Sequence, residues 1–174
     1  MNDNDNDEPI SKSPFWRFSI KFYGMPGVAA ACIELQDQVK VDVNVLFFLL
    51  WNATQGRALN ADDVAKVESM IGPWREMAVV PIRNVRRALK SPPAVMTPEA
   101  AEGFRTRIKA VELEAERLQQ EALYGLAESG ELGRPAASPI QAAQDSVSSY
   151  QGVIGPFPPG PLETVLSAFA GFKP

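Results

Sequence analysis

The sequence predicts an all-α protein: one compact bundle of about six to eight helices that includes a long heptad-like helix. Apolar residues recur every three to four positions along most of the chain, as they do on one face of a helix. Residues that typically begin helices, such as Asp42 and Thr97-Pro98, stand directly before these stretches. Alternation of apolar and polar residues is not sustained anywhere, so we expect no sheet.

The size and composition fit one soluble domain. A chain of 174 residues is long enough to bury a substantial core. Its hydrophobic content of 45% and charged content of 22% are ordinary for soluble proteins. The net charge of −4 argues against a general binder of polyanions, so we expect no nucleic-acid partner.

Two residue counts exclude several kinds of enzyme. The sequence contains no histidine, which excludes Ser-His-Asp and Cys-His triads and histidine-bearing zinc and di-iron sites. Cys32 is its one cysteine, which excludes an intrachain disulfide and a cysteine-rich zinc site. We therefore expect no cofactor and no enzyme of a standard class.

The first segments predict a tail and two helices. Residues 1–13 are acidic and polar, and we expect them to be a disordered tail. A helix follows from Pro14 to about Gly24, with apolar positions 15, 18 and 22 on one face. Pro26 can occupy the first turn of a second helix, over about 26–38, whose inner face carries Cys32.

The third predicted helix, over about 43–54, is the expected centre of the fold. Asp42 precedes it as an N-cap. Residues 45–51, VLFFLLW, are seven consecutive apolar residues, so every face of this helix needs cover.

Asn60 predicts the start of the next helix. Its inner face should carry Val64, Val67, Met70 and Ile71. Gly72-Pro73 should break this helix and begin another, which Pro81 should kink or divide.

Thr97-Pro98-Glu99 predicts the start of the long helix, which should continue to about residue 129. Its apolar positions repeat like a heptad seam: Phe104, Ile108, Val111, Ala115, Leu118, Ala122 and Gly125. This seam can pack internally or form a homodimer through residues 104–126. Residues 14–129 would then be a helical domain, followed over 130–174 by a linker and one or two weaker helices near 139–151 and 161–170.

Several short segments together resemble an uncharacterised proteobacterial all-helical family, known only as a domain of unknown function. The segments are Phe15-Trp16, Phe18-Ser19, Pro26-Gly27-Val28, Ala31-Cys32, Leu35-Gln36-Asp37, Asp42-Val43-Asn44, Leu49-Leu50-Trp51, Trp74, and Pro81-Ile82-Arg83 to Arg86-Arg87. The resemblance covers roughly residues 14–125 and departs from the family pattern at Lys40-Val41 and Phe47-Phe48. It implies a compact helical protein of the bacterial cytoplasm and no particular activity.

The leading candidate site is a basic helical face. Arg83, Arg86, Arg87 and Lys90 follow a spacing that places four cations along one side of a helix. Like charges this close repel, so they need an acidic protein surface, a phosphate-bearing partner or carboxylates of the same chain. The internal carboxylates would be Asp37, Asp42 or glutamates of the long helix.

Three other groups of residues are candidates with a structural explanation beside the functional one. Gln36, Asp37, Asp42 and Asn44 form a polar cluster between two apolar helices, which we interpret as capping or buried pairing rather than a cation or catalytic site. Cys32 fits a buried apolar position. Phe15, Trp16, Trp51 and Trp74 fit an aromatic core or the lining of a pocket.

These observations favour a cytoplasmic adaptor or regulatory module, without enzymatic activity, that binds proteins through the basic face. The alternatives are a small-molecule carrier with an aromatic-lined pocket between helices, and an orphan helical enzyme that uses Asp37 and Asp42. The apolar run at 45–51 is far shorter than the ~20 residues that a membrane span needs, so we expect no membrane span.

Overall fold

The computed structural model describes residues 13–173, and eight α-helices and a π-helix account for most of them. The elements are α1 (Pro14–Tyr23), α2 (Val28–Val39), α3 (Val43–Thr54), β1 (Arg57–Ala58), α4 (Ala61–Trp74), the π-helix η1 (Arg75–Val79), α5 (Val80–Ala88), α6 (Pro98–Glu128), β2 (Arg134–Pro135), α7 (Pro139–Ile154) and α8 (Pro159–Gly171). The all-α prediction is confirmed. Of the predicted acidic tail, residues 1–12 lie outside the described residues, and Ser13 is the N-cap of α1.

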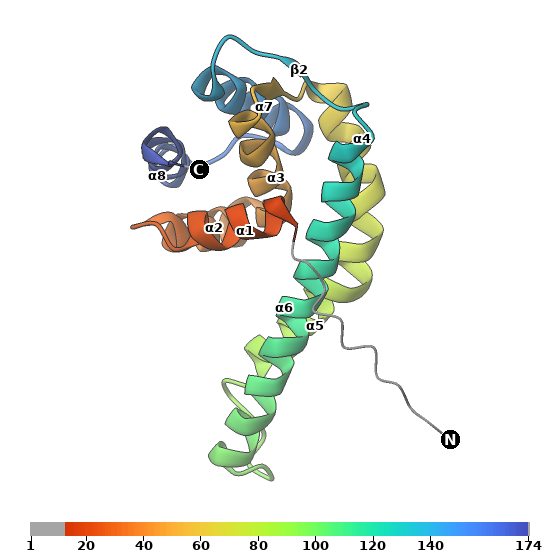
Figure 1. Cartoon of the computed structure of the whole chain (residues 1–174). Helices are drawn as coiled ribbons and strands as arrows, with labels where there is room; N and C mark the ends of the chain where they lie inside the picture. Colours follow the sequence, from red (N-terminus) through yellow and green to blue (C-terminus); the bar gives the residue numbers. More distant parts are fainter. Residues whose placement is uncertain (1–12, 174) are drawn as a thin grey trace, which may run out of the picture.

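The helices form a globular part and a projecting arm (Figure 1). In the globular part α3 contacts α1, α6 and α7, and α8 packs against α2. α4 and α6 run side by side along one edge of the molecule. Beyond this edge, α5 and the first half of α6 project from the globular part, and we call residues 80–112 the arm. Arg87 of α5 still reaches Asp37 of α2.

α3 is the centre of the core, as predicted. Every side chain from Asn44 to Ala53 is buried. The carboxylate of Asp42 caps the helix by accepting from the backbone N–H groups of Asn44 and Val45. Aromatic rings of α1 pack edge-on against α3, for example Phe22 against Phe47 with ring centroids 5.2 Å apart. Burial of each such large side chain stabilises the fold by about 1.5–3 kcal/mol.

The chain does not break at Gly72-Pro73, so this prediction is wrong. α4 continues through Pro73, and the backbone then widens into the π-helix over Arg75–Val79. A proline removes one backbone donor, and burial of Ile71 and Gly72 against the core holds the helix together across that position. Met70, which the apolar pattern placed on the inner face of this helix, is 51% exposed.

A very short sheet is present, contrary to the expectation of none. β1 and β2 pair antiparallel over two residues each, with Arg57 opposite Pro135. The Arg57 guanidinium also donates to the carbonyls of Leu132 and Gly133, at 2.6–3.1 Å. Gly133 has φ +72° and lies so close to β1 that a Cβ there would stand 3.2 Å from the carbonyl oxygen of Ala58. These contacts tie the segment before α7 to the loop after α3.

The last two helices contribute to the same core. Val147 and Tyr150 of α7 are buried against α3, and Val165 and Phe169 of α8 are buried beside α2. Within residues 13–173, no helix combines the length and the apolar character that crossing a membrane requires.

Candidate functional site

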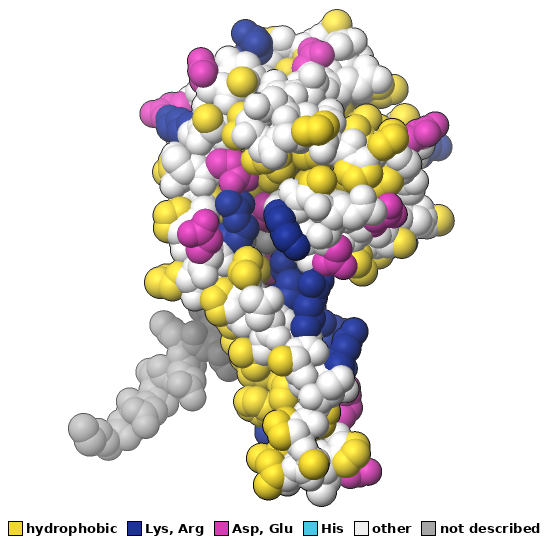
Figure 2. All heavy atoms as spheres, turned by 180° about the vertical axis from the view of Figure 1, so that it is seen from behind, with side chains coloured by type: hydrophobic (Ala, Val, Ile, Leu, Met, Phe, Trp, Pro, Cys, Tyr) yellow, Lys and Arg dark blue, Asp and Glu magenta, His cyan; other side chains and the backbone are white. Residues whose placement is uncertain are grey.

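The arm carries the predicted basic face. α5 and α6 pack side by side along it, and α5 contributes Arg83, Arg86 and Arg87, with Lys90 just after its end. Figure 2 shows Lys and Arg side chains gathered in a band that runs from the globular part onto the arm, beside apolar side chains. The structure divides the four predicted cations into two pairs with different surroundings.

Arg83 and Arg86 are bound by two glutamates of α6. Arg83 donates from Nε to Glu112 Oε1 (2.9 Å) and from a terminal nitrogen to Glu116 Oε1 (2.6 Å). Arg86 also forms an ion pair with Glu112. The Glu112 side chain is 7% exposed and the two arginines are 16% and 21% exposed. This internal neutralisation is one of the outcomes considered from the sequence, and it makes Arg83 and Arg86 part of the α5–α6 packing.

The pKa values of Glu112 and Glu116 are shifted in opposite directions. Burial opposes ionisation of Glu112, but hydrogen bonds from Arg86 and Arg83 outweigh it and lower the pKa of Glu112. Burial raises the pKa of Glu116, and its contact with Arg83 only partly offsets this effect. Hydrogen bonding to Glu112 raises the pKa of Arg86 against the opposing effect of burial. Glu112 is therefore the main counter-charge of this cluster.

Arg87 and Lys90 remain open to solvent. Arg87 pairs with Asp37 at 2.8 Å, and both side chains are nearly half exposed, at 43% and 49%. Lys90 is exposed and forms no ion pair among residues 13–173. An exposed ion pair contributes about 0–1 kcal/mol, so Arg87 can exchange Asp37 for another carboxylate at little cost.

Of the four residues in the predicted polar cluster, the structure brings only Asp42 and Asn44 together. Asp42 and Asn44 lie together in the interior, whereas Asp37 pairs with Arg87 on the surface and Gln36 is half-buried. Asp42 accepts from Arg75 (3.0 Å) and from the Gln119 amide (2.7 Å). The Gln120 amide donates to Asn44 at 2.8 Å.

Sequence reasoning missed the residues that complete this network. Arg75 bridges Asp42 and Glu68, and the Tyr150 hydroxyl donates to Glu68 at 3.0 Å. Burial raises the pKa of Tyr150, and its two carboxylate neighbours add to that rise. One feature of the sequence could have indicated this network. Gln119 and Gln120 are adjacent amides on the long helix, and they need hydrogen-bond partners because they are buried.

The remaining candidates fit their structural explanations. Cys32 is 1% exposed, and burial raises the pKa of its thiol to about 12. Phe15 packs on Trp51, and Trp51 packs on Tyr124, with ring centroids 5.7 and 5.6 Å apart. The Trp74 indole N–H donates to the carbonyl of Ala115. Phe15 and Trp51 are buried in the core, and Trp74 and Tyr124 are half-buried at its edge. None of these rings lines the two surface clefts beside α8.

The predicted heptad seam on α6 is divided between inside and outside. Ala115 is buried and Ile108 is half-buried, whereas Phe104, Val111 and Leu118 are 43–51% exposed. The buried positions of this helix are Ala101, Glu112, Ala115, Gln119, Gln120 and Leu123. The seam therefore does not pack internally as a whole.

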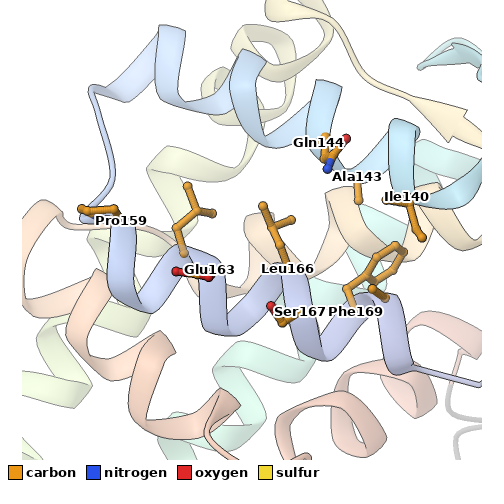
Figure 3. A pocket seen from close by; sticks show the side chains of 10 residues that line it. Ile140, Ala143, Gln144, Pro159, Glu163, Leu166, Ser167 and Phe169 are labelled. Carbon is orange, nitrogen blue, oxygen red and sulfur yellow. The ribbon is translucent and has the colours of Figure 1, made fainter.

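A surface cleft of about 470 Å³ lies between α7 and α8 (Figure 3). Its walls are mainly apolar, with Ile140 from α7 and Leu166 and Phe169 from α8. Gln144 and Glu163 add polar groups. The cleft forms where α7 and α8 pack against each other across residues 155–158, and no local pattern in the sequence predicts that packing.

Comparison with known proteins identifies a family. No curated protein and no solved structure matches this chain. The model of a family described as "Protein of unknown function (DUF2390)" matches residues 14–123, which include the basic face, Asp42 and the first 26 residues of α6. Because the match covers more than half of the 174 residues, the chain belongs to this family, DUF2390.

Proposed function

We propose that this protein is a non-enzymatic adaptor or regulatory module of the bacterial cytoplasm that binds an acidic protein surface through the exposed end of α5. The observation that carries the proposal is the division of the basic face. Arg83 and Arg86 are neutralised by Glu112 and Glu116 in half-buried pairs. Arg87 has only an exposed pair with Asp37, and Lys90 is exposed and forms no ion pair among residues 13–173.

The surroundings of these two cations suit protein binding. Val85, Val95 and Met96 on the same arm are 45–83% exposed, so apolar contact area is available near the charges. Interfaces combine apolar contacts with a charged rim that steers association. An exposed surface with only two cations fits a protein partner better than a small anion, which needs several convergent donors.

The enzyme alternative has less support. Asp37 and Asp42, the two carboxylates considered for acid–base chemistry, pair with different arginines, Arg87 and Arg75. Asp42 also accepts from two backbone N–H groups and from Gln119, so its oxygens are already occupied. A general base needs free access to the proton that it takes.

The carrier alternative is favoured by one observation, the cleft between α7 and α8. Native mass spectrometry of protein from its own cells would show a retained small molecule. Leu166→Arg, which places a charge in the cleft wall, should release that molecule. Absence of any added mass in the wild-type protein would remove the carrier from consideration.

The adaptor proposal is tested by capture from the cytoplasm of the source cells. The double variant Arg87→Glu/Lys90→Glu should lose a protein that the wild type captures specifically, while keeping its circular dichroism spectrum and melting temperature. Lys109→Glu is the matched control, because Lys109 is an exposed cation of α6 outside the proposed surface.

Arg83→Glu does not test binding, because it would place a third carboxylate beside Glu112 and Glu116 and disturb the packing of α5 on α6. If the double variant captures the same proteins as the wild type, the basic end of α5 is not the binding surface. If Lys109→Glu loses the partner equally, the effect is general electrostatics and the proposal fails.

A further inference from the structure

An apolar row that no other part of residues 13–173 covers runs along the outer face of α6. Phe104, Val111 and Leu118 are 43%, 51% and 44% exposed and lie seven residues apart. Seven residues make almost two helical turns, so the three side chains form one row along the helix. Ala122 and Gly125 are also exposed and continue the row toward the end of α6.

Small residues beside the row leave room for another helix. Gly103 and Ala110 are exposed neighbours of Phe104 and Val111. A Cβ added at Gly103 or Gly125 would meet nothing within 4 Å. Small residues opposite large side chains allow two helices to approach each other more closely.

Two opposite charges border the row on one side. Arg107 and Glu114 are seven residues apart, on the same edge of α6. Arg107 lies over the Phe104 ring at 5.7 Å and has no ion pair among the described residues. Glu114 pairs with Arg117, yet its side chain is 54% exposed and a carboxylate can accept further hydrogen bonds.

We propose that α6 packs antiparallel against α6 of a second copy of this chain, about a twofold axis beside Val111. This register places Phe104 opposite Leu118 of the second copy, and Val111 opposite its own equivalent. Leu118 also meets the open space at Gly103 of the other chain.

The charges select the antiparallel arrangement. Around this axis Arg107 of each chain faces Glu114 of the other, so the pair forms twice. A parallel twofold arrangement would instead place this edge of the two chains on opposite sides of the interface, so Arg107 would not meet Glu114 of the other chain. The two edge charges therefore complement each other only when the helices run in opposite directions.

The size of the surface predicts a weak dimer. In this register the two helices overlap over residues 98–124, about 40 Å of helix, and a strip about 10 Å wide along it covers roughly 400 Å² per chain. Stable interfaces bury about 800 Å² per partner, so we expect a dissociation constant in the micromolar range or above. This surface is separate from Arg87 and Lys90, and the dimer does not depend on the function proposed above.

Cysteine cross-linking tests the direction of packing. Phe104→Cys and Leu118→Cys proteins are purified separately, then mixed at about 100 µM with a short bismaleimide linker. The antiparallel register predicts strong cross-linking in the mixture and little in either protein alone. Cys32 is buried and does not interfere. Equal cross-linking within Phe104→Cys alone would contradict the proposed direction, and no cross-linking in the mixture would contradict the dimer.

Charge exchange tests the same register without cysteines. In sedimentation equilibrium, Arg107→Glu and Glu114→Arg should each weaken dimerisation about tenfold, because each change creates two repulsive contacts. The double variant Arg107→Glu/Glu114→Arg restores opposite charges and should recover most of the affinity. Lys109→Glu, away from the row, should leave it unchanged. A wild type that stays monomeric at 1 mM, about the limit for a weak interface, or a double variant no better than the single ones, would overturn the proposal.

Discussion

The hydroxyl oxygen of Tyr150 accepts a hydrogen bond from the backbone N–H of Asp42, 108 residues earlier in the chain, at 3.2 Å. The same hydroxyl donates to Glu68, which shares Arg75 with the Asp42 carboxylate. α3, α4 and α7 therefore meet in one buried polar network. Removal of one side chain from this network leaves its neighbours in the interior without a hydrogen-bond partner. This lowers the free energy of unfolding by more than the loss of one isolated hydrogen bond.

Asp42→Ala should lower the free energy of unfolding by about 3 kcal/mol, because it removes the N-cap of α3 and the acceptor of Arg75 and Gln119. Asp42→Asn keeps a capping oxygen and should cost less. Asn60→Ala, which removes only the capping box of α4, should cost about 1 kcal/mol. Urea denaturation measures all three, and equal losses for Asp42→Ala and Asn60→Ala would show that Asp42 acts only as a cap.

The role of Asp42 as a cap was predictable because capping depends on residues two and three positions away. The same holds for the helix starts at Asn60 and Thr97. Its partners Arg75 and Gln119 lie 33 and 77 positions away, and no local pattern relates such distances. The sequence thus predicts where helices begin, but long-range polar pairing depends on a packing that only the structure contains.

Glu112→Gln should destabilise the protein by about 2 kcal/mol at pH 7, because Arg83 and Arg86 would lose their shared counter-charge. The lowered pKa of Glu112 means that its contribution is present above the pKa of the unfolded chain and disappears as pH falls through the folded value. The stability difference between wild type and variant should therefore shrink toward pH 3, about one unit below an ordinary glutamate pKa. A difference that stays constant between pH 7 and pH 3 would contradict this assignment.

Glu116→Gln should change the stability at pH 7 by less than about 0.5 kcal/mol. Burial raises the pKa of Glu116, so its ionised form already disfavours the fold relative to an ordinary glutamate. In Glu116→Gln, loss of the ion pair with Arg83 lowers the free energy of unfolding, and removal of the buried charge raises it. Urea denaturation beside Glu112→Gln provides the comparison, and a loss as large as that of Glu112→Gln would show that the two glutamates are equivalent.

The basic face shows why a surface is harder to predict than a helix. The spacing of Arg83, Arg86 and Arg87 correctly places them along one helix. Which of them face solvent depends on Glu112 and Glu116. The apolar pattern of α6 left open whether Phe104, Val111 and Leu118 pack inside the protein or against a second copy, and all three are exposed. A long helix in contact with polar partners can bury polar side chains and expose apolar ones, so apolar periodicity alone does not decide which face of the helix lies inside.

Cys32 should resist thiol reagents in the folded protein. Its side chain is 1% exposed, and burial raises the pKa of the thiol to about 12. At pH 8 the thiolate fraction is then roughly a thousandfold smaller than for an ordinary cysteine. Ellman's reagent should react within minutes in 6 M guanidinium, a denaturing concentration, and hardly at all without denaturant. Rapid reaction of the native protein would show that α2 opens frequently.

Deletion of residues 130–174 should abolish cooperative folding, because α7 and α8 complete the core rather than extend it. Val147, Tyr150, Val165 and Phe169 are all buried, and each contributes about 1.5–3 kcal/mol. Their sum, roughly 6–12 kcal/mol, is comparable to the whole stability of a typical domain. Chain 1–129 should therefore lose its near-ultraviolet circular dichroism and its sharp urea transition. Addition of the separate peptide 130–174 should restore part of both signals, since the missing contacts are then available again. A native-like urea transition of chain 1–129 on its own would instead make residues 14–129 an independent domain, as the composition of the chain suggested.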